Sequence, residues 1–256
     1  MNQKALELGL TNTHFETPHG LDSDEHYTTA YELALLSNYA LNNKTFAQIV
    51  GTKEYTITIN GYPKQVSNTN ELLGNLNGVY GIKTGFTNGA NRCLVTACKR
   101  NDIDIICVVL GADTKKFRTR DSIKLINYIF DNFENVNIEK IINDSFENWK
   151  NKNLNKIIIN KGISDNINLK LENISNTTIP IRKDLINSIQ VEINCPLYFE
   201  TPVYKNSHLG TITVNIPNNE TLNYSIYCST EIRHKNWNDY LLYFFKNYSY
   251  IINTLL

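Results

Sequence analysis

The chain has 256 residues, and its 25 Lys and Arg are balanced by 25 Asp and Glu, so the formal net charge is zero. This length provides a buried core for one large or two modest domains, and the lack of a net positive field disfavours nucleic-acid binding. The five cysteines form no Cys-x-x-Cys pair, and their odd number excludes a complete set of intramolecular disulfides.

Two helices are expected in the first 50 residues. Residues 1–8 carry apolar side chains at helical spacing, and Gly9 is placed to end that helix. After a loop in which Asp22 is interpreted as a turn residue, residues 29–32 (Thr-Ala-Tyr-Glu) form a capping box for a helix that continues to about Asn42. His14 and His19 lie five residues apart without a helical partner, so neither a metal site nor a cofactor is expected.

Alternating apolar residues predict two β-hairpins. The first has strands at 53–59 and 62–66 around the turn Asn60-Gly61. The second has apolar strands at 92–99 and 103–111 around residues 100–102. A helix over 116–133 has one apolar face, which can cover the sheet.

The composition changes after Phe133. Residues 134–155 are rich in asparagine and are interpreted as a linker, with a poorly defined element around Trp149. Residues 156–232 then show short alternating runs separated by Asn, Gly and Pro turns, which predict a small all-β domain. The expected strands are 156–160, 167–171, 189–193, 208–216 and 222–227.

The last segment, residues 233–256, has a different pattern. From Trp237 onward, apolar and aromatic residues recur at steps of four and three, as on one face of a helix. Lys246-Asn247 interrupts the apolar run, which favours a helix lying on a membrane surface over a spanning helix of about 20 apolar residues. A helix docked on the protein's own core is the alternative.

A short polar motif stands before the second hairpin. Lys83-Thr84-Gly85 opens an apolar run, and in strand geometry its side chains alternate between two faces. A glycine lets a ligand lie close to the strand, while an ammonium and a hydroxyl can bind a carboxylate. The tripeptide alone is a common match, so its neighbours decide how it is interpreted.

Those neighbours resemble one family. Residues 81–87 (Gly-Ile-Lys-Thr-Gly-Phe-Thr), 93–95 and 108–112 resemble the third active-site motif of the serine-type D-Ala-D-Ala carboxypeptidases, the low-molecular-mass penicillin-binding proteins. Residues 13–22 and 28–34 match the same family in the same order. The resemblance implies an α+β fold: part of the β-lactamase-like antiparallel sheet with its helices, then the small β-rich domain, then a C-terminal amphipathic helix.

The family's other two motifs are missing. These enzymes use a Ser-x-x-Lys nucleophile and a Ser-x-Asn motif before the Lys-Thr-Gly strand. No serine of this chain has a lysine three residues later. Ser164-Asp165-Asn166 follows Lys-Thr-Gly instead of preceding it and is interpreted as a turn. The chain is therefore expected to correspond to the C-terminal portion of such an enzyme, with residues 1–133 forming the end of the catalytic domain.

The resemblance implies roles for five residues. Lys83 and Thr84 would bind the terminal carboxylate of the substrate, and Gly85 would leave room for it. The backbone N–H of Phe86 would be one of two oxyanion donors; the other belongs to the missing serine. Arg118 aligns with a family arginine that aids carboxylate binding, and Arg120 is the less favoured register.

The sequence thus predicts a carboxypeptidase that removes the terminal D-Ala from peptidoglycan stem peptides, with this chain inactive by itself. Its expected partners are a stem peptide ending in D-Ala-D-Ala, β-lactams in the complete enzyme, and a membrane surface through residues 236–256. The expected location is outside the cytoplasm, although Met1-Asn2-Gln3-Lys4 begins no signal peptide. The alternatives are a non-catalytic wall- or membrane-associated module and, more weakly, a penicillin-hydrolysing relative.

Overall fold

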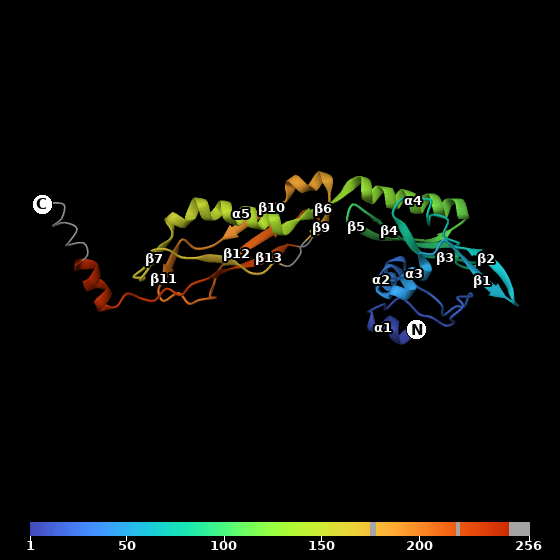
Figure 1. The fold of residues 1–256 in the computed structure, drawn as a ribbon, viewed down its shortest axis with the longest axis horizontal. Coiled ribbons are helices and arrows are strands. Elements are labelled where there is room, and N and C mark those ends of the chain that lie inside the picture. The colour runs from blue at the N-terminus through green and yellow to red at the C-terminus, as the bar shows by residue number, and fades with distance from the viewer. Residues whose placement is uncertain (175–177, 219–220, 246–256) are drawn as a thin grey trace. The chain divides into compact units, whose positions relative to one another are not determined.

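The computed structural model describes residues 1–174, 178–218 and 221–245. The chain divides into two compact units, residues 1–134 (unit 1) and 135–256 (unit 2), shown in Figure 1. Helices and mainly antiparallel strands occur in both units, which confirms the predicted α+β class.

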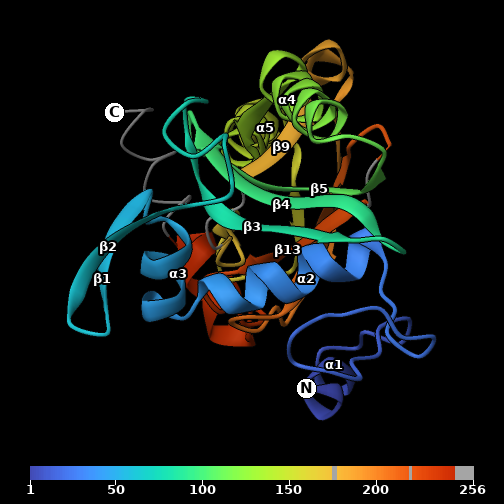
Figure 2. The same ribbon diagram turned by 90° about the vertical axis from the view of Figure 1, so that its right-hand side faces the viewer.

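Unit 1 is built around a three-stranded antiparallel sheet in the order β3-β4-β5. Helix α4 lies on one face of this sheet and α2 on the other (Figure 2). The elements of unit 1 are α1 (Asn2–Glu7), α2 (Ala30–Leu41), α3 (Lys44–Val50), β1 (Glu54–Ile59), β2 (Tyr62–Ser67), β3 (Val79–Thr87), β4 (Asn91–Arg100), β5 (Ile103–Ala112) and α4 (Lys115–Asn132).

Both predicted hairpins are confirmed. Strands β1 and β2 pair around Asn60 and Gly61, whose φ angles are 51° and 81°. Strands β4 and β5 pair around Asn101 and Asp102, with φ angles of 48° and 63°. Two successive residues with positive φ match the right-handed twist of the flanking strands, so two-residue turns close both hairpins.

Side chains at their N-termini cap the two helices that cover the sheet. The Thr29 side chain accepts a hydrogen bond from the Glu32 N–H at the start of α2, and Thr114 accepts one from the Phe117 N–H at the start of α4. The predicted capping box is only half correct, because in the described structure the Glu32 side chain does not bond back to the Thr29 N–H. The Glu32 carboxylate accepts hydrogen bonds from the Asn12 N–H at 2.9 Å and from Thr13, so it ties the preceding loop to α2.

The core of unit 1 is small and lies between the sheet and α4. One of its two cysteines, Cys107, is 7% exposed, and this burial raises the pKa of the thiol to about 11. The described cysteines are all free. The buried members of this cluster are Leu72, Leu73, Val79, Leu94, Cys98, Cys107 and Ile126.

Unit 2 contains a four-stranded sheet in the order β10-β12-β13-β8 and two small two-stranded sheets, β11-β7 and β6-β9. Its strands are β7 (Ile158–Asn160), β8 (Leu169–Leu171), β9 (Thr178–Arg182), β10 (Gln190–Asn194), β11 (Tyr198–Glu200), β12 (His208–Asn215) and β13 (Leu222–Cys228), with β6 (Phe133–Asn137) leading in from unit 1. Its helices are α5 (Ile138–Asn153), η1 (Leu154–Lys156) and η2 (Lys183–Ser188).

The predicted linker over 134–155 is wrong, because most of it forms α5. Asn137 caps this helix by accepting a hydrogen bond from the Lys140 N–H. Ile138, Ile142 and Phe146 lie four residues apart on one face and are at most 3% exposed within the unit's core. Unit 2 therefore combines this helix with the strands that follow it, whereas the stretch 156–232, predicted to be β-rich, has seven strands and no α-helix among its described residues.

Residues 237–245 are helical, as predicted, and the rest of the predicted tail helix lies outside the described residues. The side chains of Trp237, Leu242 and Phe245 are 75%, 69% and 63% exposed, so they do not pack on the core. Within the described residues, no helix combines the length and the apolar character needed to cross a bilayer.

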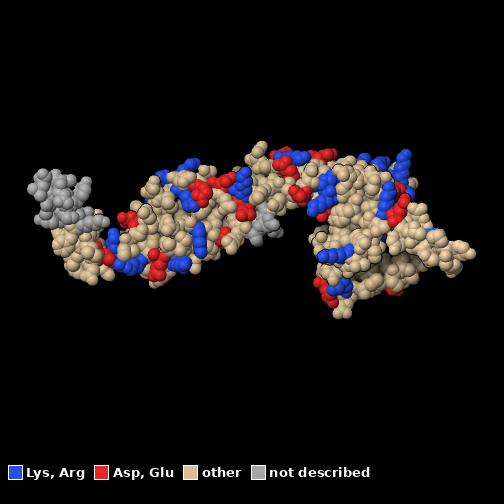
Figure 3. Space-filling model, in the orientation of Figure 1, with Lys and Arg blue, Asp and Glu red and all other residues tan. Residues whose placement is uncertain are grey.

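Charged residues of both signs are interspersed on the face of the molecule shown in Figure 3. This distribution agrees with the balanced composition, since neither sign covers a whole unit on that face. The chemistry of unit 1 must therefore be sought in local groups of side chains.

Candidate functional site

A cleft of about 1160 Å³ in unit 1 brings together segments that are far apart in the sequence. One wall is the strand β3, from Lys83 to Thr87; the others come from the loop around residues 15–28, the segment 68–71 and the start of α4. Strand β3 pairs only with β4 in the described sheet, so it is an edge strand. Its free backbone groups can pair with an extended ligand.

The Lys-Thr-Gly motif lines this cleft together with Phe86. The Lys83 ammonium donates a hydrogen bond to the Thr84 carbonyl oxygen at 2.6 Å, and the Thr84 hydroxyl lies 2.6 Å from that of Thr69. A Cβ built on Gly85 would meet only Cys93, at 3.7 Å, so the space beside this glycine is open. The strand thus presents one ammonium, one hydroxyl and an unobstructed stretch of backbone.

The ring of Phe86 is 52% exposed at the edge of the cleft. The guanidinium of Arg92, its cross-strand neighbour on β4, lies 3.4 Å from the ring centroid. Cation–π packing therefore holds this ring on the hairpin surface, while the role predicted for the Phe86 N–H stays a prediction.

Arg118 lies at the cleft, near the start of α4, and is only 4% exposed. Within the described structure, its Nε and Nη2 atoms make no hydrogen bond. A buried guanidinium with unused donors is costly unless a ligand or solvent completes it. Arg120 lines no part of this cleft; it bonds Asp121 at 3.0 Å and packs on the ring of Phe117.

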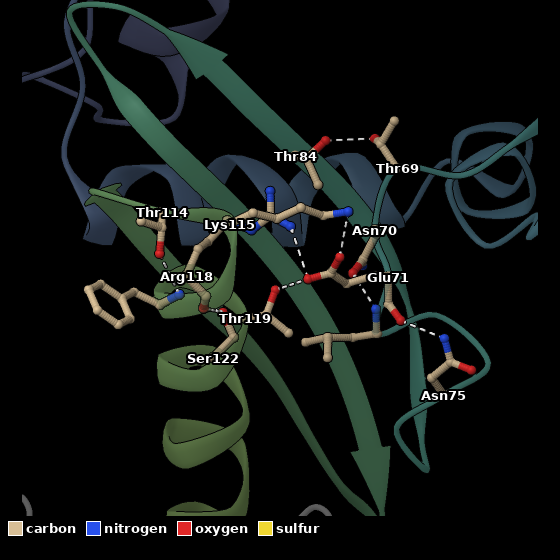
Figure 4. A network of polar contacts seen from close by, with 12 residues as sticks. Thr69, Asn70, Glu71, Asn75, Thr84, Thr114, Lys115, Arg118, Thr119 and Ser122 are labelled. Atoms are coloured by element: carbon tan, nitrogen blue, oxygen red, sulfur yellow. Dashed lines mark hydrogen bonds and ion pairs between the residues drawn. The ribbon is translucent and has the colours of Figure 1, made fainter.

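Glu71 is a cleft residue that the sequence did not reveal. Its carboxylate pairs with the Lys115 ammonium at 2.7 Å, accepts a hydrogen bond from Thr119 and lies 3.6 Å from Arg118 Nη2 (Figure 4). Burial by itself would raise the pKa of Glu71, but Lys115, Thr119 and Arg118 outweigh it and hold the pKa below its ordinary value.

Asp22 is a second residue whose role the sequence concealed. Its carboxylate accepts a hydrogen bond from the Gly89 N–H at 3.0 Å, across 67 residues. Hydrogen bonds from Thr87 and Gly89 lower the pKa of Asp22. The interpretation of Asp22 as a turn residue alone is therefore wrong, because it joins the loop 15–28 to the turn after β3.

Ser164-Asp165-Asn166 forms a turn in unit 2, as predicted. The Ser164 hydroxyl accepts a hydrogen bond from the Asn166 N–H at 3.1 Å. Among the described residues, no group of three or more His, Cys, Asp or Glu is arranged to hold a metal ion.

The chemistry available in the cleft is recognition of an anion at the end of an extended chain. Lys83 and Arg118 provide cations, Thr84 provides a hydroxyl, and the edge of β3 provides backbone groups. The cleft-lining residues include no serine.

Comparison with known proteins finds that unit 1 is similar to one family. A family model for D-alanyl-D-alanine carboxypeptidases, peptidase S11, matches residues 1–114. The chain is 38% identical over 135 residues to D-alanyl-D-alanine carboxypeptidase DacF of Bacillus subtilis, covering 52% of this chain and 35% of that protein. It is 43% identical over 138 residues to DacC of Escherichia coli, covering 53% of this chain and 34% of that protein. The chain thus spans about a third of the length of these two relatives.

Solved structures support the fold over a longer stretch. Penicillin binding protein 5 from Haemophilus influenzae superposes with a TM-score of 0.59 over 91% of this chain and 64% of that one, at 23% identity. The carboxypeptidase DacD from Francisella tularensis gives a TM-score of 0.58 over 91% of this chain and 67% of that one, at 21% identity. These likenesses show the fold alone. Residues 1–114, most of unit 1, match the peptidase S11 family of D-alanyl-D-alanine carboxypeptidases, and relatives named as such carboxypeptidases are 38% and 43% identical over 135 and 138 residues.

Proposed function

We propose that unit 1 is the substrate-binding part of a D-Ala-D-Ala carboxypeptidase and binds peptidoglycan stem peptides through their terminal carboxylate. The observation that carries the proposal is the meeting of Lys83, Thr84 and Arg118 in one cleft, with Arg118 Nε and Nη2 making no hydrogen bond in the described structure. A terminal carboxylate is the ligand group that uses such donors in a charge-assisted way.

The proposed pose places the peptide along the free edge of β3. The backbone of the penultimate residue would pass Gly85, which has no side chain to obstruct it. The terminal carboxylate would contact Thr84, Lys83 and Arg118. The scissile carbonyl would then lie near the Phe86 N–H, as one of two oxyanion donors. Losing one such donor costs about 3–4 kcal/mol of transition-state stabilisation.

The nucleophile is the part that this sequence does not supply. Family enzymes form an acyl-enzyme on the serine of Ser-x-x-Lys, and this chain has no such pair. We therefore expect the 256-residue chain to bind the peptide without hydrolysing it and to form no covalent adduct with penicillin. Stoichiometric labelling by a fluorescent penicillin would contradict this expectation.

The binding test compares two ligands that differ by one charge. An N-acetylated tripeptide ending in D-Ala-D-Ala should bind more tightly as the free acid than as the C-terminal amide, measured by NMR titration of the purified chain. Arg118→Met should reduce the preference for the acid by about tenfold or more, because one charge-assisted hydrogen bond contributes about 1.5–3 kcal/mol. Arg120→Met is the matched control, since it removes an arginine on the same helix that lies outside the cleft. Equal binding of acid and amide would reject the proposal.

The exposed aromatic side chains of 237–245 favour a location at a membrane surface. The similarity to D-alanyl-D-alanine carboxypeptidases favours the side outside the cytoplasm. Sedimentation with anionic vesicles, compared between the wild type and a Trp237→Ser, Phe245→Ser variant, tests this part. If vesicles bind and the peptide does not, the alternative of a non-catalytic membrane- or wall-associated module is favoured.

A further inference from the structure

Hydrogen bonds of neighbouring residues fix the backbone at Glu71, independently of the contacts that its carboxylate makes. The preceding residue, Asn70, donates a hydrogen bond to the Gly81 carbonyl of β3 at 3.0 Å and accepts one from the Leu72 N–H at 3.2 Å. The Glu71 carbonyl accepts a hydrogen bond from Asn75 at 2.8 Å (Figure 4). Fixed backbone on both sides therefore sets where the Glu71 side chain lies.

The carboxylate reaches three groups on the first two turns of α4. Oε2 pairs with Lys115 at 2.7 Å, and Oε1 accepts the Thr119 hydroxyl and lies 3.6 Å from Arg118 Nη2. The last distance is too long for a hydrogen bond, so Glu71 acts on Arg118 through its charge. Both Glu71 and Lys115 line the cleft that contains Lys83 and Thr84.

This arrangement sets the charge at the α4 end of the cleft. Four Lys and Arg side chains line the cleft, Lys83, Arg92, Lys115 and Arg118, and so do the carboxylates of Asp22 and Glu71. The Glu71 anion forms ion pairs with two of these cations, Lys115 at 2.7 Å and Arg118 at 3.6 Å. While these pairs hold, Lys115 is engaged at hydrogen-bond distance, whereas Nε and Nη2 of Arg118 make no hydrogen bond in the described structure. Without the Glu71 charge, the cleft would gain one positive charge and release a mobile ammonium.

We propose that Glu71 is a specificity-determining residue: an internal carboxylate that occupies Lys115 and limits the binding of small anions beside Arg118. A peptide that also pairs with the edge of β3 tolerates this competition, whereas a bare anion does not, because charge is its only contact. The inference rests on the proposed function for the identity of the peptide, but its effect on small anions can be measured independently.

The test measures the affinities of the same variants for inorganic phosphate and for the acid tripeptide. The titrations are done at low ionic strength, with the Arg118 side-chain Nε–H signal as the NMR reporter. Glu71→Gln preserves the shape of the side chain and removes its charge. We expect its affinity for phosphate to rise about fivefold to tenfold, because one repulsive charge near the anion is lost in a partly screened site. The affinity for the peptide should rise less, so that the ratio of peptide to phosphate affinity falls.

Two further variants separate charge from structure. Thr119→Val removes a hydrogen bond to Glu71 and retains every charge, so its phosphate affinity should equal that of the wild type. Glu71→Gln combined with Lys115→Met should lose the gain, because the released ammonium is then missing. Phosphate binding that is unchanged in Glu71→Gln, or that rises equally in Thr119→Val, would overturn the inference. Equal wild-type affinity for the acid and amide peptides would reject the proposed function and leave the phosphate result to decide the role of Glu71.

Discussion

The two units bury different kinds of residue. Seven polar or charged residues are buried in the described structure, among them Glu32, Asn70 and Arg118, and all seven lie in unit 1. Unit 2 has a core cluster of 17 buried apolar residues, whereas the cluster of unit 1 has seven. The unit that carries the cleft thus has the smaller core and the more polar interior.

One of the seven buried polar residues, Arg118, lines the cleft. A cleft that binds a carboxylate, as proposed, needs cations that are held rigidly and partly dehydrated, and a buried polar group stabilises little unless every partner is in place. In the described part of unit 2, no polar or charged residue is buried, and apolar side chains form its interior. We infer that unit 2 is the more stable unit and that the full chain unfolds in two steps.

The largest expected effects come from removing core side chains, one in each unit. Ile226→Ala in unit 2 and Leu94→Ala in unit 1 each truncate a side chain that is 0% exposed, and each should cost about 2–5 kcal/mol. Urea unfolding followed by hydrogen exchange should show that each substitution shifts the transition of its own unit alone. If Ile226→Ala shifted both transitions equally, the two units would unfold as one, and the comparison would fail.

A smaller loss of stability, of about 2–3 kcal/mol, is expected from substituting the glycine that directly precedes β3. Gly78 has a φ of 81°, and a Cβ there would overlap the carbonyl oxygen of Lys99. Gly78→Ala should therefore destabilise unit 1 and weaken peptide binding in the cleft that follows. Gly61→Ala is the matched control, because Gly61 has the same φ and no atom within 4 Å of a new Cβ. Similar losses in the two variants would mean that backbone strain alone, and not the overlap, explains the effect.

The sequence was informative where the signals were local. The Asn60-Gly61 turn, the Thr29 cap and the alternation of β4 and β5 each lie within a few residues, and the structure has all of them. Helix α5 also had a local signal, in Asn137 as its cap and apolar residues four apart, but its asparagine-rich composition obscured it.

Contacts between distant segments could not be predicted in the same way. Thr119 binds Glu71 across 48 residues, and Gly89 binds Asp22 across 67. Nothing beside Glu71 in the sequence indicates that α4 will place Lys115 and Thr119 around it. Lys83, Thr84 and Arg118 were found through a family resemblance, whereas Glu71 required the three-dimensional structure.

Acid should reduce the stability of unit 1 by a more modest amount. Burial by itself would raise the pKa of Glu32, but hydrogen bonds from Thr13 and Asn12 outweigh it and lower the pKa, as happens at Glu71. Such groups stabilise the fold fully above their ordinary pKa near 4.5, and this contribution is lost as the pH falls through the lowered value. The unfolding midpoint of unit 1 should therefore fall below pH 4.5, and the fall should be shallower in Glu32→Gln. A midpoint that is independent of pH in this range would contradict the assignment of Glu32.

The smallest effect on global stability is expected at the helix 237–245, where the ion pair between Arg233 and Asp239 lies on the surface. Asp239 accepts two hydrogen bonds from the Arg233 guanidinium, at 2.6 and 2.9 Å, and one from the Asn236 N–H, while Asn236 accepts one from the Asp239 N–H. Arg233 and Asn236 lower the pKa of Asp239 to about 2, so this cap holds above the ordinary value of 3.8 and is lost as the pH falls toward 2.

Because exposed ion pairs contribute little to global stability, Asp239→Asn should leave the unfolding midpoint of unit 2 unchanged. It should accelerate hydrogen exchange in the first turn of the helix, and high salt should produce part of the same change in the wild type. Lys235→Met, which removes a charge next to the cap and leaves the Arg233 pair intact, is the control. A large fall in the midpoint would show that this helix supports the core of unit 2, and its exposed aromatic face would then need an explanation other than a membrane surface.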